Sequence, residues 1–251
     1  YFDSYDHFFK KYKNQIITFV EIGVLNGGSL FMWRDYFGEK ARIIGVDLNP
    51  EAKKWEKEGF EIFIGSQSDE NFWKNFIGEV GNIDIVLDDG GHTYSQQIIS
   101  ADFLIPHIKD GGLIVVEDTH TSYCNGFGDI RFSFIEYVKE KIDKINLRFY
   151  NFPKEEAEWD VWSIEIVESM VAFKVNKKAS NIDSTPIVNI KSNFPEKDFR
   201  YEDKNALKSV EDRFKNGRKD KKISLVQLEE LMKKIKIEAP NTAVRLKRIL
   251  E

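Results

Sequence analysis

The chain contains a single cysteine, Cys124, among its 251 residues. An internal disulfide is therefore impossible, and a zinc site built from several thiolates is excluded. No apolar run approaches the ~20 residues that a membrane-spanning helix needs, and no signal peptide is recognisable. A net charge of −5 gives no electrostatic reason to expect nucleic acid as a partner. These absences predict a cytoplasmic protein that acts on neither nucleic acid nor membranes.

Apolar residues are abundant, at 41% of the chain with 20 Phe, which is enough for a substantial core. Short apolar runs alternate with helical patterns, and this alternation predicts βαβ units and a parallel sheet. The predicted strands are residues 15–20, 42–46, 60–64, 83–87 and 113–116.

Two further runs, 162–167 and 171–175, flank a short turn at 168–170 and predict an antiparallel hairpin. The predicted fold is α/β: a Rossmann-like, doubly wound, mostly parallel seven-stranded sheet with a terminal antiparallel hairpin. We assign residues 1–180 to this domain and 181–251 to a partly helical C-terminal extension.

The extension contains a basic segment at 215–222, which indicates a solvated linker rather than a nucleic-acid patch against an acidic background. An apolar stripe follows at helical spacing, which predicts either core packing or a subunit contact, as in a homo-oligomer. The stripe comprises Leu225, Leu228, Leu231, Met232 and Ile235.

Acidic residues follow two of the predicted strands directly. Asp88 and Asp89 end the fourth strand, with His92 three residues further on, and Glu117 and Asp118 end the fifth. Neighbouring strands lie roughly 4.8 Å apart, so these carboxylates would converge at one edge of the sheet. Carboxylates so close repel one another unless a cation lies between them, and a hard divalent metal fits oxygen ligands.

A glycine-rich turn with Gly23, Gly27 and Gly28 follows the first strand, and Asp47 ends the second. This order suits a nucleoside whose ribose is held by a carboxylate. The spacing matches neither G-x-G-x-x-G nor a P-loop. Glu21 at the entrance of the loop would repel phosphate and suits a cationic nucleoside such as S-adenosylmethionine. A tight turn with a capping residue is the alternative.

Five segments together resemble a known family: residues 20–30, 45–47, 65–69, 88–92 and 116–123. The first is similar to the opening motif of class I S-adenosylmethionine-dependent methyltransferases. The others resemble the metal-dependent sugar O-methyltransferases of macrolide tailoring, the mycinamicin type, with relatives in the cephalosporin-hydroxylase group. The chain departs from that pattern at Cys124, where the branch has Trp.

The resemblance implies a Mg²⁺ ion held by Asp89, Glu117 and Asp118, with His92 as the general base. The alternative role of Asp118 is to cap the turn that follows, and that of His92 is a hydrogen bond within its loop. The predicted cofactor contacts are Glu21, Gly23, Gly28, Ser29, Asp47, Gln67, Ser68, Asp69 and Asp88. The predicted substrate contacts are Tyr94, His120 and Tyr123.

The resulting hypothesis is a Mg²⁺-dependent transfer of a methyl group from S-adenosylmethionine to a sugar hydroxyl. The sugar could be nucleotide-linked, part of a glycan precursor or part of a glycosylated metabolite. Three alternatives remain open: a non-sugar diol or amine acceptor, an NAD-dependent oxidoreductase on the same sheet, and a catalytically silent binding protein.

Overall fold

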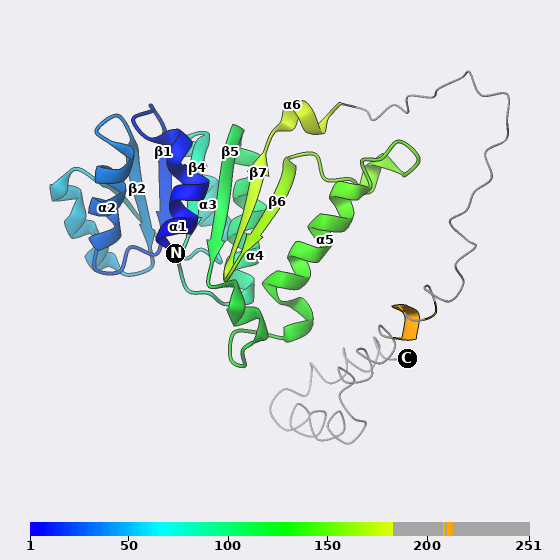
Figure 1. Cartoon of the computed structure of the whole chain (residues 1–251). Coiled ribbons are helices and arrows are strands. Elements are labelled where there is room, and N and C mark those ends of the chain that lie inside the picture. Colours follow the sequence, from blue (N-terminus) through cyan, green and yellow to red (C-terminus); the bar gives the residue numbers. More distant parts are fainter. Residues whose placement is uncertain (183–207, 209, 213–251) are drawn as a thin grey trace. The chain divides into compact units, whose positions relative to one another are not determined.

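The structure, a computed structural model, describes residues 1–182, 208 and 210–212 (Figure 1). The chain divides into two compact units, residues 1–187 and 188–251. The predicted apolar stripe at 225–235 and the basic segment at 215–222 lie outside the described residues. No helix among the described residues is long and apolar enough to cross a membrane.

The first unit is built on one seven-stranded sheet in the order β3-β2-β1-β4-β5-β7-β6. The strands β1 to β5 run parallel, and β7 lies antiparallel to both β5 and β6. The strands are β1 Thr18–Ile22, β2 Arg42–Asp47, β3 Glu61–Ile64, β4 Ile83–Asp88, β5 Ile108–Glu117, β6 Val161–Val167 and β7 Met170–Val175. The predicted parallel sheet and its antiparallel edge are confirmed.

Helices connect these strands, as the alternating pattern of the sequence predicted. The α-helices are α1 Phe2–Phe9, α2 Gly28–Phe37, α3 Glu70–Val80, α4 Tyr94–Leu104, α5 Phe134–Asn146 and α6 Lys177–Ser180. The 3₁₀ helices are η1 Lys10–Tyr12, η2 Pro50–Glu58, η3 Ile105–His107, η4 Thr119–Tyr123, η5 Ile130–Phe132 and η6 Lys154–Glu156.

Three local predictions differ from the structure. The sequence predicts one helix from about Tyr94 to His107, but α4 ends at Leu104, because Pro106 has no N–H for a further helical hydrogen bond. The fifth strand begins at Ile108, several residues before the apolar run. The hairpin turn has two residues rather than three, because Met170 already pairs with Glu117 in β5.

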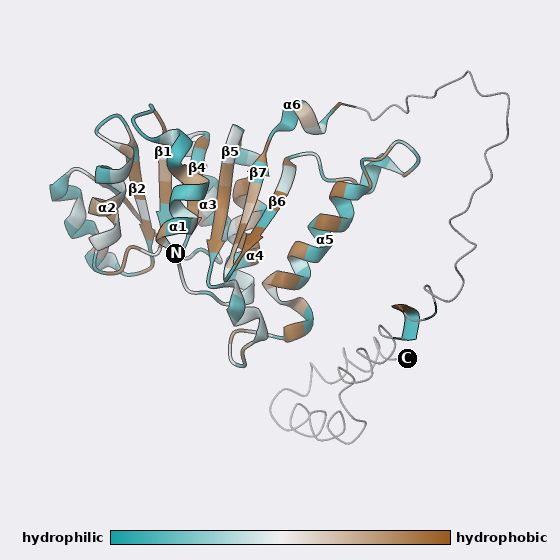
Figure 2. Ribbon diagram, viewed as in Figure 1, coloured by the Kyte–Doolittle hydropathy of each residue, from teal (hydrophilic) through white to brown (hydrophobic). Residues whose placement is uncertain are grey.

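Both faces of the sheet are buried, as expected for a mostly parallel sheet. Successive strand residues enter different cores: Val20 packs with residues of α3, α4 and α5, while Phe19 packs with residues of α1 and α2. Apolar residues are concentrated along the central strands (Figure 2). The helices α1 and α2 therefore cover one face, and α3, α4 and α5 cover the other.

The strand register places the loops of the site at one edge. Ile22 pairs with Val46 and with Asp88, and Asp88 pairs with Val116. The C-terminal ends of β1, β2, β4 and β5 are thus level with one another. The strand order reverses between β1 and β4, and open α/β sheets bind ligands at such a switch point.

Candidate functional site

A cavity of about 510 Å³ opens beyond the C-terminal ends of β1 to β4. Five residues predicted from the sequence line it: Gly23, Asp47, Gln67, Asp89 and His92. Its volume lies within the ~300–1,000 Å³ of small-molecule sites. The cavity therefore stands where the nucleoside site was predicted.

The loop after β1 is fastened to the end of β2. The Asp47 Oδ2 atom accepts hydrogen bonds from the backbone N–H of Val24 and Leu25, both at 2.9 Å. Leu25 is 81% exposed and lines the cavity beside Asn26. Neither residue was predicted as a cofactor contact, although both belong to the glycine-rich turn after the first strand.

Glu21 does not line the cavity; its side chain is buried beneath the loop. Its carboxylate accepts hydrogen bonds from Ser29 Oγ at 2.8 Å and Trp33 Nε1 at 2.9 Å, which ties β1 to α2. Burial raises the pKa of Glu21 to about 7. The structure places Glu21 and Ser29 as supports of the loop and shows no contact of either with the cavity.

Asp88 is likewise buried, below the floor of the cavity. It accepts hydrogen bonds from Gln67 Nε2 at 3.0 and 3.1 Å and from Ser100 Oγ. Gln67 Oε1 in turn accepts a hydrogen bond from Gly91 N–H at 2.8 Å. Asp88 thus orients Gln67, which does line the cavity.

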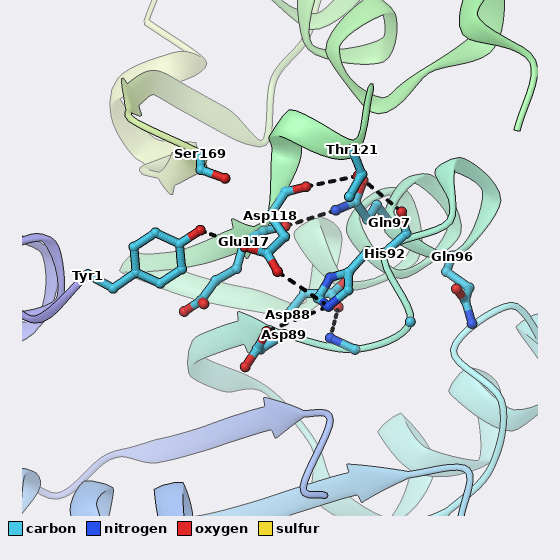
Figure 3. Close-up of polar contacts among 12 residues, drawn as sticks. Tyr1, Asp88, Asp89, His92, Gln96, Gln97, Glu117, Asp118, Thr121 and Ser169 are labelled. Atoms are coloured by element: carbon cyan, nitrogen blue, oxygen red, sulfur yellow. Dashed lines mark hydrogen bonds and ion pairs between the residues drawn. The ribbon is translucent and has the colours of Figure 1, made fainter. Parts of the chain in front are cut away.

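The second acidic residue of β4, Asp89, meets His92 and Asp118 at the edge of the sheet (Figure 3). His92 Nε2 lies 3.8 Å from Asp89 Oδ1 and 3.6 Å from Asp118 Oδ2. One potential ligand atom from each residue lies within 4.8 Å of the others. The structure thus brings together three of the four residues predicted for the metal and the base.

Both His92 and Asp118 have left-handed backbones, with φ of 57° and 51°. This conformation is uncommon for residues other than glycine and persists only where neighbours enforce it. Thr121 Oγ1 donates to the backbone carbonyls of both residues, at 3.2 and 2.8 Å. Thr121, which was not predicted as a site residue, therefore ties together the backbones that carry these two side chains.

Glu117, the fourth residue, lies buried behind this cluster. Burial, together with repulsion from Asp89 and Asp118, raises the pKa of Glu117 to about 8, although a hydrogen bond from Tyr5 opposes the shift. Its Oε1 atom is buried and has no hydrogen-bond partner in the described part of the chain. A buried, unpartnered carboxylate oxygen beside two further carboxylates fits a divalent cation that prefers oxygen ligands.

The tyrosines of the N-terminal segment reach this cluster and were also missed. Tyr1 Oη donates to Asp118 Oδ1 at 2.5 Å, and Tyr5 hydrogen-bonds Glu117. Figure 3 shows Tyr1 and Ser169 on the side of Asp118 away from His92. The i, i+4 spacing of the two tyrosines on an amphipathic helix was the available signal, but such a stripe ordinarily indicates core packing.

The remaining predicted residues lie apart from the cavity. Tyr94 is buried, and its hydroxyl donates to the backbone carbonyls of Thr121 and Cys124. Asp69, predicted as a cofactor contact, caps α3, and Tyr123 is 70% exposed. Gly28 and Ser68 do not line the cavity either. His120 lies on the Tyr1 side, with Nδ1 at 2.5 Å from Ser169 Oγ.

Comparison with known proteins relates this chain to methyltransferases. Residues 20–119 match a family described as a methyltransferase domain. The chain is 37% identical over 131 residues to an O-methyltransferase from Streptomyces olivaceus that acts on the 3′-position of 8-demethyl-8-(2-methoxy-alpha-L-rhamnosyl)-tetracenomycin-C. It is also 37% identical, over 131 residues, to mycinamicin VI 2″-O-methyltransferase from Micromonospora griseorubida. These alignments cover 49% of this chain and 33% and 32% of the relatives, so the chain spans about a third of their length.

A solved structure of the MycE methyltransferase from the mycinamycin biosynthetic pathway, in complex with Mg, SAH and mycinamycin VI, is similar in fold. The two share 27% sequence identity and a TM-score of 0.66, over 73% of this chain and 50% of that one. The matched domain, the sheet order and these relatives agree: residues 20–119 carry a methyltransferase domain on a Rossmann-like sheet, and the chain is similar to sugar O-methyltransferases.

Proposed function

We propose that the chain transfers a methyl group from S-adenosylmethionine to a sugar hydroxyl with the help of Mg²⁺. The observation that carries the proposal is the convergence of Asp89, His92 and Asp118 at the mouth of the cavity, with the unpartnered Glu117 oxygen behind them. The relatives methylate sugar-bearing molecules, and MycE binds Mg and SAH, which is S-adenosylmethionine without its methyl group.

The proposed roles fall to two groups of residues: one would bind the metal and accept the proton, and the other would bind the methyl donor. Asp89, Asp118 and Glu117 would hold the metal, which when bound orients the acceptor hydroxyl and lowers its pKa. His92, whose Nε2 faces the same point, would accept the proton of that hydroxyl. The cavity lined by Gly23 and Asp47 would hold the donor so that its methyl group faces the acceptor oxygen.

The function is tested by mass spectrometry on the purified chain with Mg²⁺, labelled S-adenosylmethionine and a panel of sugars. We expect a gain of one methyl group on a sugar and its loss when EDTA removes the metal. Methyl transfer that is insensitive to EDTA, or that occurs only on an amine, would support the alternative acceptors instead.

Replacing Asp118 with asparagine should weaken Mg²⁺ binding at least about tenfold, because one carboxylate ligand is lost. Affinity for S-adenosylmethionine should stay nearly unchanged, since Asp118 does not line the donor cavity. Calorimetric titration with each ligand separates the two effects. The exposed Asp35 on α2 offers a control, Asp35→Asn, with the same change of charge. Equal loss of both affinities would show that the two regions are not separate.

Replacing Tyr5 with phenylalanine should weaken Mg²⁺ binding roughly tenfold, because the hydrogen bond that orients Glu117 is lost. The aromatic ring remains, so its packing against Trp33, with ring centroids 5.0 Å apart, is kept. Tyr36→Phe is the matched control, since that hydroxyl donates to the exposed Asp6 instead. Unchanged Mg²⁺ affinity in Tyr5→Phe would exclude this supporting role.

A further inference from the structure

A second cavity, of about 480 Å³, lies between the end of α5, the start of β6 and α6. Its wall combines apolar side chains with the guanidinium of Arg148 and the hydroxyl of Ser180. Its volume lies within the ~300–1,000 Å³ range of small-molecule sites. Segments that are far apart in the sequence thus surround one space in which polar and apolar groups are mixed.

The strand register places this cavity at the opposite end of the sheet from the acidic cluster. Glu117 pairs with Met170 at the start of β7, whereas Val161 at the start of β6 pairs with Val175 at the end of β7. Five positions of a strand span roughly 17 Å. Figure 1 shows α6 at the end of the sheet away from the arrowhead of β5. No described residue lines both cavities, so the second one does not belong to the methyl-transfer site.

Arg148 brings an incompletely paired positive charge to the second cavity. Its Nε donates to the Ile145 carbonyl and its Nη2 to the Trp162 carbonyl, both at 3.1 Å. Its Nη1 is buried and has no hydrogen-bond partner within the described part of the chain. Burial lowers the pKa of Arg148, and the charge of Glu158 opposes this shift. Glu158 is itself paired with Lys141 at 2.8 Å, so it does not complete the contacts of the arginine.

Ser180 provides a second unsatisfied group on the same wall. Its side chain is 2% exposed, and its Oγ has no hydrogen-bond partner among the residues that the structure describes. Buried polar atoms without partners are rare in folded proteins, because each one loses its hydrogen bonds to water without replacement. Arg148 and Ser180 both line the cavity. A ligand group that only accepts hydrogen bonds could therefore satisfy both.

The rest of the wall suits a flat apolar ring. Phe149 and Trp162 line the cavity and are 49% and 48% exposed, so about half of each aromatic side chain is uncovered. Aromatic rings gain from stacked or edge-to-face contact with other rings, in addition to the burial of apolar area. Ile145 and Ile182 extend the apolar surface.

The charge of the wall favours a ligand with a single negative charge. Among the described residues that line the cavity, Arg148 is the only charged one. A carboxylate balances one guanidinium, and its oxygens can accept hydrogen bonds from both Arg148 and Ser180. A phosphate dianion would leave one negative charge without a partner in a partly buried place, which is unfavourable.

We propose that the second cavity is a ligand site separate from the methyl-transfer site, and that it takes a small aromatic monocarboxylate. In this complex the carboxylate accepts hydrogen bonds from Arg148 Nη1 and Ser180 Oγ, and the ring lies against Phe149 and Trp162. The ligand is bound and not converted, because no nucleophile or base among the described residues of the wall faces it.

The test compares three probes that share one ring system: 2-naphthoate, the neutral 2-naphthamide and the dianionic 2-naphthyl phosphate. Each is titrated into the full chain by calorimetry at pH 8, with Mg²⁺ and saturating SAH present so that the methyl-donor cavity is filled. We expect 2-naphthoate to bind at least about tenfold more tightly than either of the others, because only its charge and hydrogen bonds match the wall. Equal affinity for the three probes, or no binding of 2-naphthoate at millimolar concentration, would overturn the inference.

Two variants locate the bound probe. Arg148→Met should weaken 2-naphthoate binding at least about tenfold, whereas Arg131→Met, which removes an exposed arginine paired with Asp129, should not change it. Ser180→Ala should weaken binding roughly threefold to tenfold without lowering the midpoint of thermal unfolding, since the lost hydroxyl had no partner.

Ser95→Ala, at an exposed position of α4, is the matched control for the serine. The affinity for SAH should be the same in every variant, because none of these residues lines the donor cavity. Unchanged 2-naphthoate affinity in Ser180→Ala would place the probe elsewhere and overturn the inference, even if Arg148→Met fails to fold. Neither result depends on methyl transfer, so the proposed function stands or fails separately.

Discussion

Replacing His92 with alanine should lower kcat about 100- to 10,000-fold, the usual contribution of a positioned general base. An alcohol is a poor nucleophile at neutral pH, so the loss of the proton acceptor acts on the chemical step itself. The imidazole is well placed for this role, because its Nε2 lies within 4 Å of both Asp89 and Asp118. The expected loss corresponds to roughly 3–5 kcal/mol of transition-state stabilisation.

The same variant distinguishes a base from a metal ligand, since His92 Nε2 converges with the two carboxylates. For a base, the Mg²⁺ concentration that gives half-maximal rate stays nearly the same, and added imidazole restores part of the activity. For a ligand, Mg²⁺ binding weakens together with the rate. His107, which stacks on Phe103 far along α4, provides the control variant His107→Asn. Full activity in His92→Ala would remove the assignment of the base.

Replacing Gly23 with alanine should destabilise the protein by about 2–5 kcal/mol and abolish binding of both S-adenosylmethionine and Mg²⁺. An added Cβ would lie 2.1 Å from the backbone carbonyl oxygen of Asp89 and 2.8 Å from the carbonyl carbon. Gly23 also has a φ of +92°, which L-residues rarely adopt. Because the obstacle is main chain, relief requires moving either the donor loop or Asp89 itself.

Thermal unfolding and calorimetric titration measure these effects, and a loss of 1 kcal/mol corresponds to roughly 2–4 °C for a domain of this size. Gly78→Ala serves as the control, because this exposed glycine in α3 has no described atom within 4 Å of its added Cβ. That change should stabilise the protein by up to about 1 kcal/mol. Gly23→Ala with unaltered stability and ligand binding would show that the two loops are not coupled.

Much of the fold could be predicted because both faces of the sheet are buried. Apolar runs such as Ile83–Leu87 can be recognised as strands without knowledge of the strands they pair with. Acidic residues directly after these runs mark the strand ends. The convergence of Asp89 and Asp118 followed from parallel pairing alone. These inferences depend on local sequence and on the regular spacing of a sheet.

The direction of a side chain was not predictable in the same way. Glu21 and Asp88 lie near the C-terminal ends of β1 and β4, but each side chain is held inward by partners elsewhere in the chain, such as Trp33 and Ser100. Tyr5 lies more than a hundred residues before Glu117, and nothing in its local sequence separates a site tyrosine from a core one. Contacts between distant segments decided these roles.

The two-residue turn between β6 and β7 lies outside residues 20–119, which carry the match to the methyltransferase domain. The same is true of α1, whereas Asp89, His92 and Asp118 all lie within that span. The turn of a hairpin can change in length or in charge without disturbing the parallel strands that hold Asp89, His92 and Asp118. Residues of this turn, such as Glu168 and Ser169, can therefore change in evolution or by engineering while Asp89, His92 and Asp118 keep their places at the ends of β4 and β5.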